Sequence, residues 1–294
     1  MKTTFLSLLL LFTILANAQC PYPAANTQNG TTQTFCIGNP NEVITINNMN
    51  GINFLLVNVV QGFTYNFSVG DVFAANTENL NIYDAATNAS LAFASGASGA
   101  SISNWVSTLS GQIKIILSLD ACVQTNNTNV SIAIEIVAVG NTFDNQNTFG
   151  TNNWVGHVYN WLGNAPPPGG TSPVTPSNTY PFDSSGYAGY YNIGTEAFVE
   201  GFGGNDVCFP VSSNGAVRTN IMTDVFAVRY KMRSTRPAGC YLATFKGDDG
   251  IRLYNDGVLV FDRWVQQPPS NYNNVLIYLD GDADLIFDFY EYNI

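Results

Sequence analysis

Short β-prone runs separated by turn-forming residues are the feature that most constrains the fold of this chain. The segment 130–136 alternates strictly, with Val or Ile at every second position, which is the period of a strand with one buried face. Charged residues make up only 11% of the chain. The Asn, Thr, Ser and Gly that replace them are poor residues for helix interiors. The sequence therefore predicts an all-β protein and argues against a helical bundle.

The first half carries enough such runs for an antiparallel sandwich of the jelly-roll type. Its strands are expected near 42–48, 52–59, 63–69, 80–83, 90–94, 101–108, 112–119 and 129–138. The Gly-, Asn- and Thr-rich stretch 140–153 offers few core residues, so it is expected to link two separately packed domains, 19–139 and 154–294.

The second half continues with a further set of strands. They are expected near 223–232, 240–246, 251–255, 258–261, 274–279 and 285–290. Asp256-Gly257 lies between two apolar runs and predicts a type I′ hairpin turn, because both central positions of that turn need a positive φ. The strand 285–290 runs almost to the end of the sequence and is expected to leave an open edge. We therefore expect an N-terminal fragment whose second domain is truncated at its C-terminus.

The N-terminus predicts export. Residues 1–18 form a secretory signal peptide, with Lys2, the apolar run 5–15 and a small-residue cleavage site at 16–18. No later run is long enough to span a bilayer, so no membrane insertion is expected. The net charge of −11 argues against nucleic acid or an anionic membrane as a partner. It is compatible with a cation or a neutral polyhydroxyl ligand.

The five cysteines include no close Cys-x-x-Cys pair, so disulfides are the default in an exported protein. Spacing suggests Cys20–Cys36 and Cys208–Cys240, with Cys122 left over. The pair Cys36–Cys122 remains an alternative.

Residues 150–294 resemble the protective-antigen-type β-sandwich domain of bacterial toxins, glycosidases and fungal flocculins. The shared elements are Gly239-x-Tyr241, Asp248-Asp249-Gly250-x-Arg252-Leu253-Tyr254, Asp256-Gly257, Asp262-x-Trp264, the preceding strand 226–230 and the opening strand Trp154-x-Gly156-x-x-Tyr159. The first half is similar to β-sandwich modules of exported Bacteroidetes surface proteins, through Gly62-x-Thr64-Tyr65-x-Phe67-Ser68 and Leu80-x-Ile82-Tyr83-Asp84.

The paired Asp248 and Asp249 are the candidate metal ligands. Calcium favours carboxylate oxygens, but adjacent side chains on a strand point to opposite faces. The two can share an ion only if the backbone bends sharply or their peptide bond is cis, and Gly247 and Gly250 would ease such a bend. The resemblance implies an Asp-cis-Asp calcium site that bridges to sugar hydroxyls, as in the flocculin branch. The alternative is a polar turn without an ion, as in the toxin branch.

Other candidate carbohydrate-binding residues lie nearby in the sequence. Trp264 could stack on a sugar ring or end a strand in the core. The expected loop 266–274 follows Trp264 in the sequence. Its amide and tyrosine side chains suit the recognition of sugar hydroxyls, at Asn271, Tyr272, Asn273 and Asn274. Arg252 and Asp262 are expected to pair across the hairpin, and the single His157 is expected to be a scaffold residue.

Together these observations predict a secreted or cell-surface carbohydrate-binding or adhesion protein of a Gram-negative bacterium. No enzyme activity is expected, and calcium is the expected cofactor of the binding. Two alternatives stay open: a structural spacer in a large adhesin, and an accessory domain of a glycoside hydrolase whose catalytic part is absent here.

Overall fold

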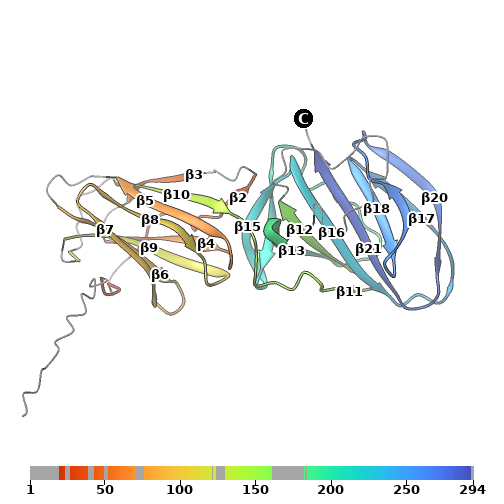
Figure 1. Ribbon diagram of the computed structural model, residues 1–294, viewed down its shortest axis with the longest axis horizontal. Coiled ribbons are helices and arrows are strands. Elements are labelled where there is room, and N and C mark those ends of the chain that lie inside the picture. Colours follow the sequence, from red (N-terminus) through yellow and green to blue (C-terminus); the bar gives the residue numbers. More distant parts are fainter. Residues whose placement is uncertain are drawn as a thin grey trace, which may run out of the picture.

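The protein is all-β, as the sequence predicts (Figure 1). The computed structural model describes residues 20–23, 27–38, 43–49, 52–70, 76–120, 122–123, 130–160, 182 and 184–292. The expected signal peptide lies outside the described residues. One short 3₁₀ helix, η1 (Ser184–Gly186), accompanies the strands. Among the described residues there is no helix whose length and apolarity would let it traverse a bilayer.

Two sheets built from residues 27–138 pack into the first sandwich. One has the order β1-β4-β9-β6-β7 and the other β3-β10-β5-β8. The strands are β1 (Thr27–Gln28), β3 (Val43–Met49), β4 (Asn53–Val59), β5 (Thr64–Gly70), β6 (Glu78–Asp84), β7 (Ser90–Gly96), β8 (Gly99–Val106), β9 (Gly111–Leu119) and β10 (Val130–Ala138). In β10, Val130, Ile132, Ile134 and Ile136 are all buried, which is the face that the alternating pattern predicts.

The second sandwich packs a two-stranded sheet, β17-β20, on a large sheet of order β19-β18-β21-β16-β12-β13-β14-β15-β2, with β11 beside β16. Phe245 of β17 stacks on Phe261 of β19, 4.7 Å between ring centroids, and lies near Phe287 of β21. These rings join the two layers. The strands are β2 (Cys36–Ile37), β11 (Gly150–Thr151), β12 (Trp154–Asn160), β13 (Tyr187–Ile193), β14 (Cys208–Ser213), β15 (Ala216–Met222), β16 (Val225–Ser234), β17 (Gly239–Gly247), β18 (Gly250–Asn255), β19 (Val258–Arg263), β20 (Ser270–Leu279) and β21 (Ala283–Tyr292).

The hairpin between β18 and β19 confirms the turn expected at Asp256-Gly257. Both residues have a positive φ, 48° and 79°, and the flanking residues Asn255 and Val258 are paired. This is the backbone geometry of a two-residue type I′ turn.

The last strand does not leave an open edge, so that expectation is wrong. β21 lies between β16 and β18 and is paired to both along its length. The edges of the large sheet are instead β19 and β2. Strand order is set by long-range pairing, which position in the chain does not predict.

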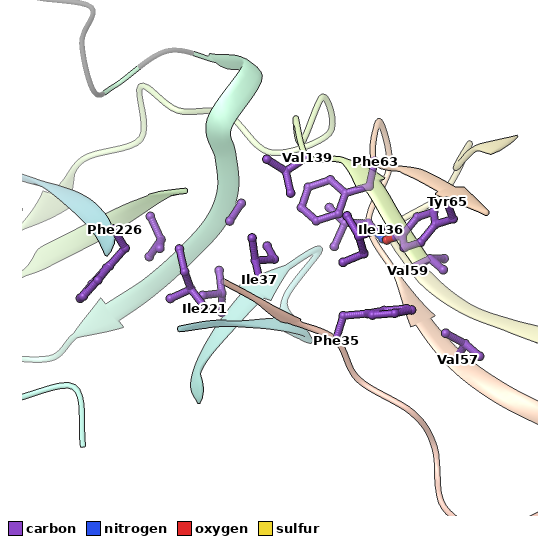
Figure 2. Close-up of a cluster of buried hydrophobic side chains, with 14 of the residues drawn as sticks. Phe35, Ile37, Val57, Val59, Phe63, Tyr65, Ile136, Val139, Ile221 and Phe226 are labelled. Atoms are coloured by element: carbon purple, nitrogen blue, oxygen red, sulfur yellow. The ribbon is translucent and has the colours of Figure 1, made fainter. Parts of the chain in front are cut away.

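The two sandwiches share one hydrophobic core rather than two separate ones, which corrects the expectation of independent packing. β2 leaves the first half of the chain and pairs in parallel with β15 of the second. Figure 2 shows Phe35 and Ile37 on this segment, with Val59 and Tyr65 on one side and Ile221 on the other. All of these side chains belong to one buried cluster. No strand was predicted at β2, because it pairs over only two residues.

The expected linker 140–153 is also tied into the structure. Asn141 is buried, and its amide donates a hydrogen bond to the Ser213 hydroxyl at 3.1 Å. Its backbone N–H donates to the Tyr187 carbonyl at 2.7 Å. Further along, β11 pairs with β16. Polar residues that looked like a solvated connector therefore satisfy buried backbone groups at the junction.

The disulfides differ from both expected pairings. Cys20 is bonded to Cys122, and Cys36 is bonded to Cys208. Cys240, expected to pair with Cys208, is the free cysteine and is exposed. The physical reason is topological: β2 carries Cys36 away from the first sandwich and places it beside β14, which begins at Cys208. Two disulfides indicate an extracellular or otherwise oxidising environment.

Candidate functional site

The segment Asp248-Asp249 connects the two layers of the second sandwich. It follows β17, which belongs to the two-stranded sheet, and precedes β18, which belongs to the large sheet (Figure 1). The peptide bond between Asp248 and Asp249 is cis. This is one of the two backbone arrangements under which the sequence allows the two carboxylates to share an ion.

Both flanking glycines are required by close packing. A Cβ atom on Gly250 would lie 1.9 Å from the Tyr290 ring, and one on Gly247 would lie 2.7 Å from the Ile251 side chain. Contacts this short cannot be accommodated without displacing the neighbouring side chain. The glycines thus let the crossing segment lie directly against β21 and β18.

Asp249 is held in place by four hydrogen bonds, one of them from its backbone N–H to the Tyr290 carbonyl at 3.2 Å. Its carboxylate accepts the backbone N–H of Gln267 on one oxygen, at 2.9 Å, and the N–H of Tyr292 on the other, at 3.0 Å. The amide of Gln267 donates to the Asp249 carbonyl at 2.7 Å. Burial raises the pKa of Asp249, the two N–H donors oppose that rise, and the charge of Asp248 adds to it. The carboxylate is therefore fixed in orientation but electrostatically unfavourable.

Asp248 and Glu291 bring two further carboxyl groups to the same region. Asp248 is exposed. Burial raises the pKa of Glu291 to about 8, and the charges of Asp249, Asp248 and Asp224 contribute to that rise. Lys246 is the nearest basic residue along the chain, but no ion pair joins it to these carboxylates in the described part of the protein. The site carries more negative charge than its surroundings neutralise.

The four candidate residues 271–274 lie in the first half of β20, and only two of them lie near the crossing segment. Asn271 lies opposite Lys246 in the β17–β20 ladder, close to the start of the crossing segment, and Tyr272 donates a hydrogen bond from its hydroxyl to Gln267. Asn273 and Asn274 are exposed but follow a register shift that carries them toward Ala243. The structure therefore brings Asn271 and Tyr272 to the aspartates and sets Asn273 and Asn274 further along β20.

Trp264 packs beneath this segment. Its ring lies 4.2 Å from the Arg252 guanidinium carbon and 4.6 Å from the Tyr290 ring. The side chain is half-buried. These contacts agree with the interpretation of Trp264 as a residue that ends a strand and supports the sheet.

Arg252 does not form its ion pair across the hairpin, which corrects the expected partner. It is opposite Asp262 in the strand register, but its Nε donates to Asp288 at 2.9 Å. Arg229 donates to the other oxygen of Asp288 at 2.8 Å. One buried carboxylate thus joins β16, β21 and β18, and the sequence alone could not show it because the three strands are far apart in the chain.

His157 lies in the same cross-sheet row, opposite Arg229. Its ring is hydrogen-bonded to the Tyr187 hydroxyl and the Thr148 carbonyl. Burial lowers the pKa of His157 to about 4. A neutral, fully partnered imidazole suits the scaffold role expected for it.

The sequence did not predict that Gln267 and Glu291 lie beside Asp249. Gln267 and Glu291 carry no motif of their own, and they reach Asp249 only because the β19–β20 connection and the end of β21 converge there. No group of three or more His, Cys, Asp or Glu within the described residues is spaced to hold a metal ion. A cation at Asp248 and Asp249 would therefore need oxygens from amides, carbonyls or a ligand as well.

The comparisons with known proteins match the chain over different lengths. A family model described as "Domain of unknown function (DUF8695)" matches residues 44–141. No curated protein matches the chain. An anti-sigma factor domain-containing protein from Clostridium clariflavum aligns over 82% of this chain and 74% of its own, at 13% identity and a TM-score of 0.29. Another anti-sigma factor domain-containing protein aligns over 89% and 81%, at 12% identity and a TM-score of 0.28. Similarity this low supports no inference about function.

Proposed function

We propose that the protein is a secreted or cell-surface carbohydrate-binding or adhesion protein, and that its second sandwich binds glycans through a calcium ion at Asp248 and Asp249. The observation that carries this proposal is the adjacent carboxylates of Asp248 and Asp249, which belong to none of the ion pairs among the described residues, beside the exposed amide of Asn271. The resemblance of residues 150–294 to the protective-antigen-type domain supports the same site.

The residues present fit a calcium ion. Calcium takes hard oxygen ligands and tolerates irregular geometry, and Asp248 and Asp249 supply two carboxylates. The raised pKa of Asp249 has burial and the neighbouring charge of Asp248 as causes, and a cation would relieve the repulsion. When bound, the ion would offer open coordination positions to vicinal sugar hydroxyls.

The chain's own residues would orient the ligand. The N–H groups of Gln267 and Tyr292 fix the Asp249 carboxylate, so it needs no rearrangement on binding. Tyr272 holds Gln267 in turn through its hydroxyl. Asn271 is exposed at the adjacent end of β20 and can exchange hydrogen bonds with hydroxyl groups.

A glycan array run with and without a chelator tests the proposal. The mature chain, 19–294, should bind a subset of glycans in calcium and lose them in chelator. Asp248→Asn should lose the same signals, because it removes a ligand charge from an exposed position. Asp280→Asn is the matched control, since it removes one charge from an exposed turn residue elsewhere. Glycan binding that persists in chelator would contradict the calcium bridge.

A rigid spacer is the second candidate function. The observation that favours it is the junction, where β2, the shared core and the Cys36–Cys208 disulfide join the two sandwiches. A chain that binds neither calcium nor any glycan on the array, while remaining folded, would support this function instead.

A further inference from the structure

An uncharged apolar face lies on the outside of the two-stranded sheet. Leu242 and Leu276 are directly paired across β17 and β20, and Cys240 is paired with Tyr278 in the same way. The exposed fractions of Leu242, Leu276 and Tyr278 are 68%, 64% and 60%. These four side chains form what we call the β17–β20 face. Figure 1 shows these two strands at the outer side of the second sandwich.

The face contains the free thiol of the chain. All five cysteines lie within the described residues; four form the two disulfides, and Cys240 is free and exposed. In an oxidising environment an odd, exposed cysteine is the usual site of an intermolecular disulfide. The apolar face and the thiol are separate observations that point to one partner surface.

The odd cysteine and two-fold symmetry identify a second copy as the partner, and the neutral surface permits it. Two copies with a net charge of −11 repel each other, so they can meet only where the surface is neutral. Residues 237–245 and 272–279 contain no charged side chain. A two-fold contact is self-complementary, because each copy presents the same patch. It can therefore place Cys240 next to the same residue of the other copy.

The size of the face explains why a covalent bond would be needed. Four side chains expose an area on the order of a few hundred Å², comparable with the largest patch on an ordinary monomer. A standard stable interface buries about 800 Å² on each partner. The apolar contact alone would hold two copies weakly and orient them, and a disulfide would make the pair permanent.

We propose that the β17–β20 face joins two copies of this chain in a symmetric dimer linked by a disulfide between their Cys240 residues. The Cα atoms of the two cysteines must come within about 7 Å. Ala238 and Gly239 next to Cys240 have small side chains, so the two backbones can approach that closely at this end of β17.

The chemistry requires an oxidant of the disulfide class. One Cys240 thiolate attacks a donor disulfide, forming a mixed disulfide and releasing one donor thiolate. The second Cys240 thiolate then attacks the Cys240 sulfur of the mixed disulfide, releasing the other donor thiolate. Two protein thiols are oxidised, one donor disulfide is reduced, and the two protons of the protein thiols pass to the two donor thiolates, which end as thiols.

The dimer would leave the candidate calcium site accessible. Cys240 and Asp248 lie at opposite ends of β17, about 26 Å apart at the rise of an extended strand. A dimer would therefore present two sites at once, which raises avidity for a repeating polysaccharide. The dimerisation itself does not depend on whether the site binds calcium.

The test is disulfide exchange in the mature chain with oxidised glutathione as the donor. We expect a dimer on a non-reducing gel, and a Cys240–Cys240 peptide pair in mass spectrometry. Cys240→Ser should abolish this dimer. The double variant Leu276→Lys/Tyr278→Lys keeps the thiol but charges the face, so the dimer should fall about tenfold relative to the glutathione adduct. Val199→Lys is the matched control, because Val199 is 97% exposed outside this face.

Two results would overturn the proposal. One is a wild-type chain that accumulates only the glutathione adduct and stays monomeric. The other is a dimer that forms equally well when Leu276 and Tyr278 are lysine, because the face would then contribute nothing. A thermal unfolding measurement on each variant first establishes that the variant is folded.

Discussion

The two sandwiches differ in the basic residues and ion pairs that they contain. In the mature chain the first half has Lys114 as its one basic residue, and the other eight lie at Arg218 and beyond. All four ion pairs within the described residues belong to the second sandwich. They join Arg229 and Arg252 to Asp288, Arg233 to Asp284, and Arg236 to Glu196. The first sandwich is held by apolar packing, and the second by apolar packing together with paired charges.

This difference shows where the negative charge of the second sandwich remains unpaired. Four of its six arginines, Arg229, Arg233, Arg236 and Arg252, are paired with carboxylates elsewhere in the sandwich, such as Asp288. Asp248, Asp249 and Glu291 lie outside those pairs, and their mutual repulsion raises the pKa values of Asp249 and Glu291 on top of burial. The central claim is that this remaining charge forms a cation site.

The largest effect is expected from removing the buried carboxylate of Asp288. Asp288→Ala leaves Arg229 and Arg252 facing each other without a counter-charge, which should lower the free energy of unfolding by about 3–5 kcal/mol. Asp284→Ala is the matched control, since its pair with Arg233 is exposed and should cost at most about 1 kcal/mol. Urea unfolding measures both, and equal losses would remove the distinction between buried and exposed pairs.

The junction disulfide should come next. Cys208→Ser opens the Cys36–Cys208 link and should lower the free energy of unfolding by about 2–4 kcal/mol. Because the link joins the two sandwiches, proteolytic cleavage within 140–153 should also become faster. Cys240→Ser should change neither quantity, since that thiol is free and exposed. An unchanged cleavage rate in Cys208→Ser would mean that the core and hydrogen bonds alone hold the junction.

A smaller effect is expected at the glycine beside the candidate site. Gly250→Ala forces the Tyr290 ring to move and should cost about 1–3 kcal/mol. Gly70→Ala at the end of β5 meets no atom within 4 Å and should be nearly neutral. Thermal unfolding of the two variants compares a closely packed glycine of the second sandwich with a glycine of the first sandwich that has open space around it.

The smallest expected effect is on pH dependence. The pKa of Glu291 is raised to about 8 in the folded protein from 4.5, so the folded state holds its proton longer than the unfolded state does. Stability should therefore fall as pH rises toward 8. From about pH 7.5 to 8 the depressed pKa of His157 contributes almost no slope, because the imidazole is by then neutral in the unfolded state as well as in the folded one. In chelator, the melting temperature of Glu291→Gln should change less with pH across this window than that of the wild-type protein. An equal change would mean that other groups cause the pH dependence.

The sequence predicted most strands but not their partners. Alternation located β3 to β10 and β16 to β21, since each has a buried face or an apolar run. It missed β13 to β15, where Pro210 and Gly189 interrupt the pattern, and the two-residue β2. Cysteine spacing gave the wrong disulfides because β2 crosses to the other sandwich, and pairing over such distances has no local signal.

The candidate site was predictable in its aspartates and not in their surroundings. Asp248 and Asp249 stand out because glycines flank them in a recognisable motif. Gln267 and Glu291 reach them from segments 18 and 42 residues further along the chain, counted from Asp249. Such residues become visible only when the strand order is known.

Calorimetric titration of the mature chain with calcium tests the central claim most directly. The wild-type protein and Asp280→Asn should bind calcium with measurable heat, and Asp248→Asn should show none while melting at the wild-type temperature. Equal heats for Asp248→Asn and the wild-type protein, or no heat for any of the three, would contradict the assignment of a calcium site to Asp248 and Asp249.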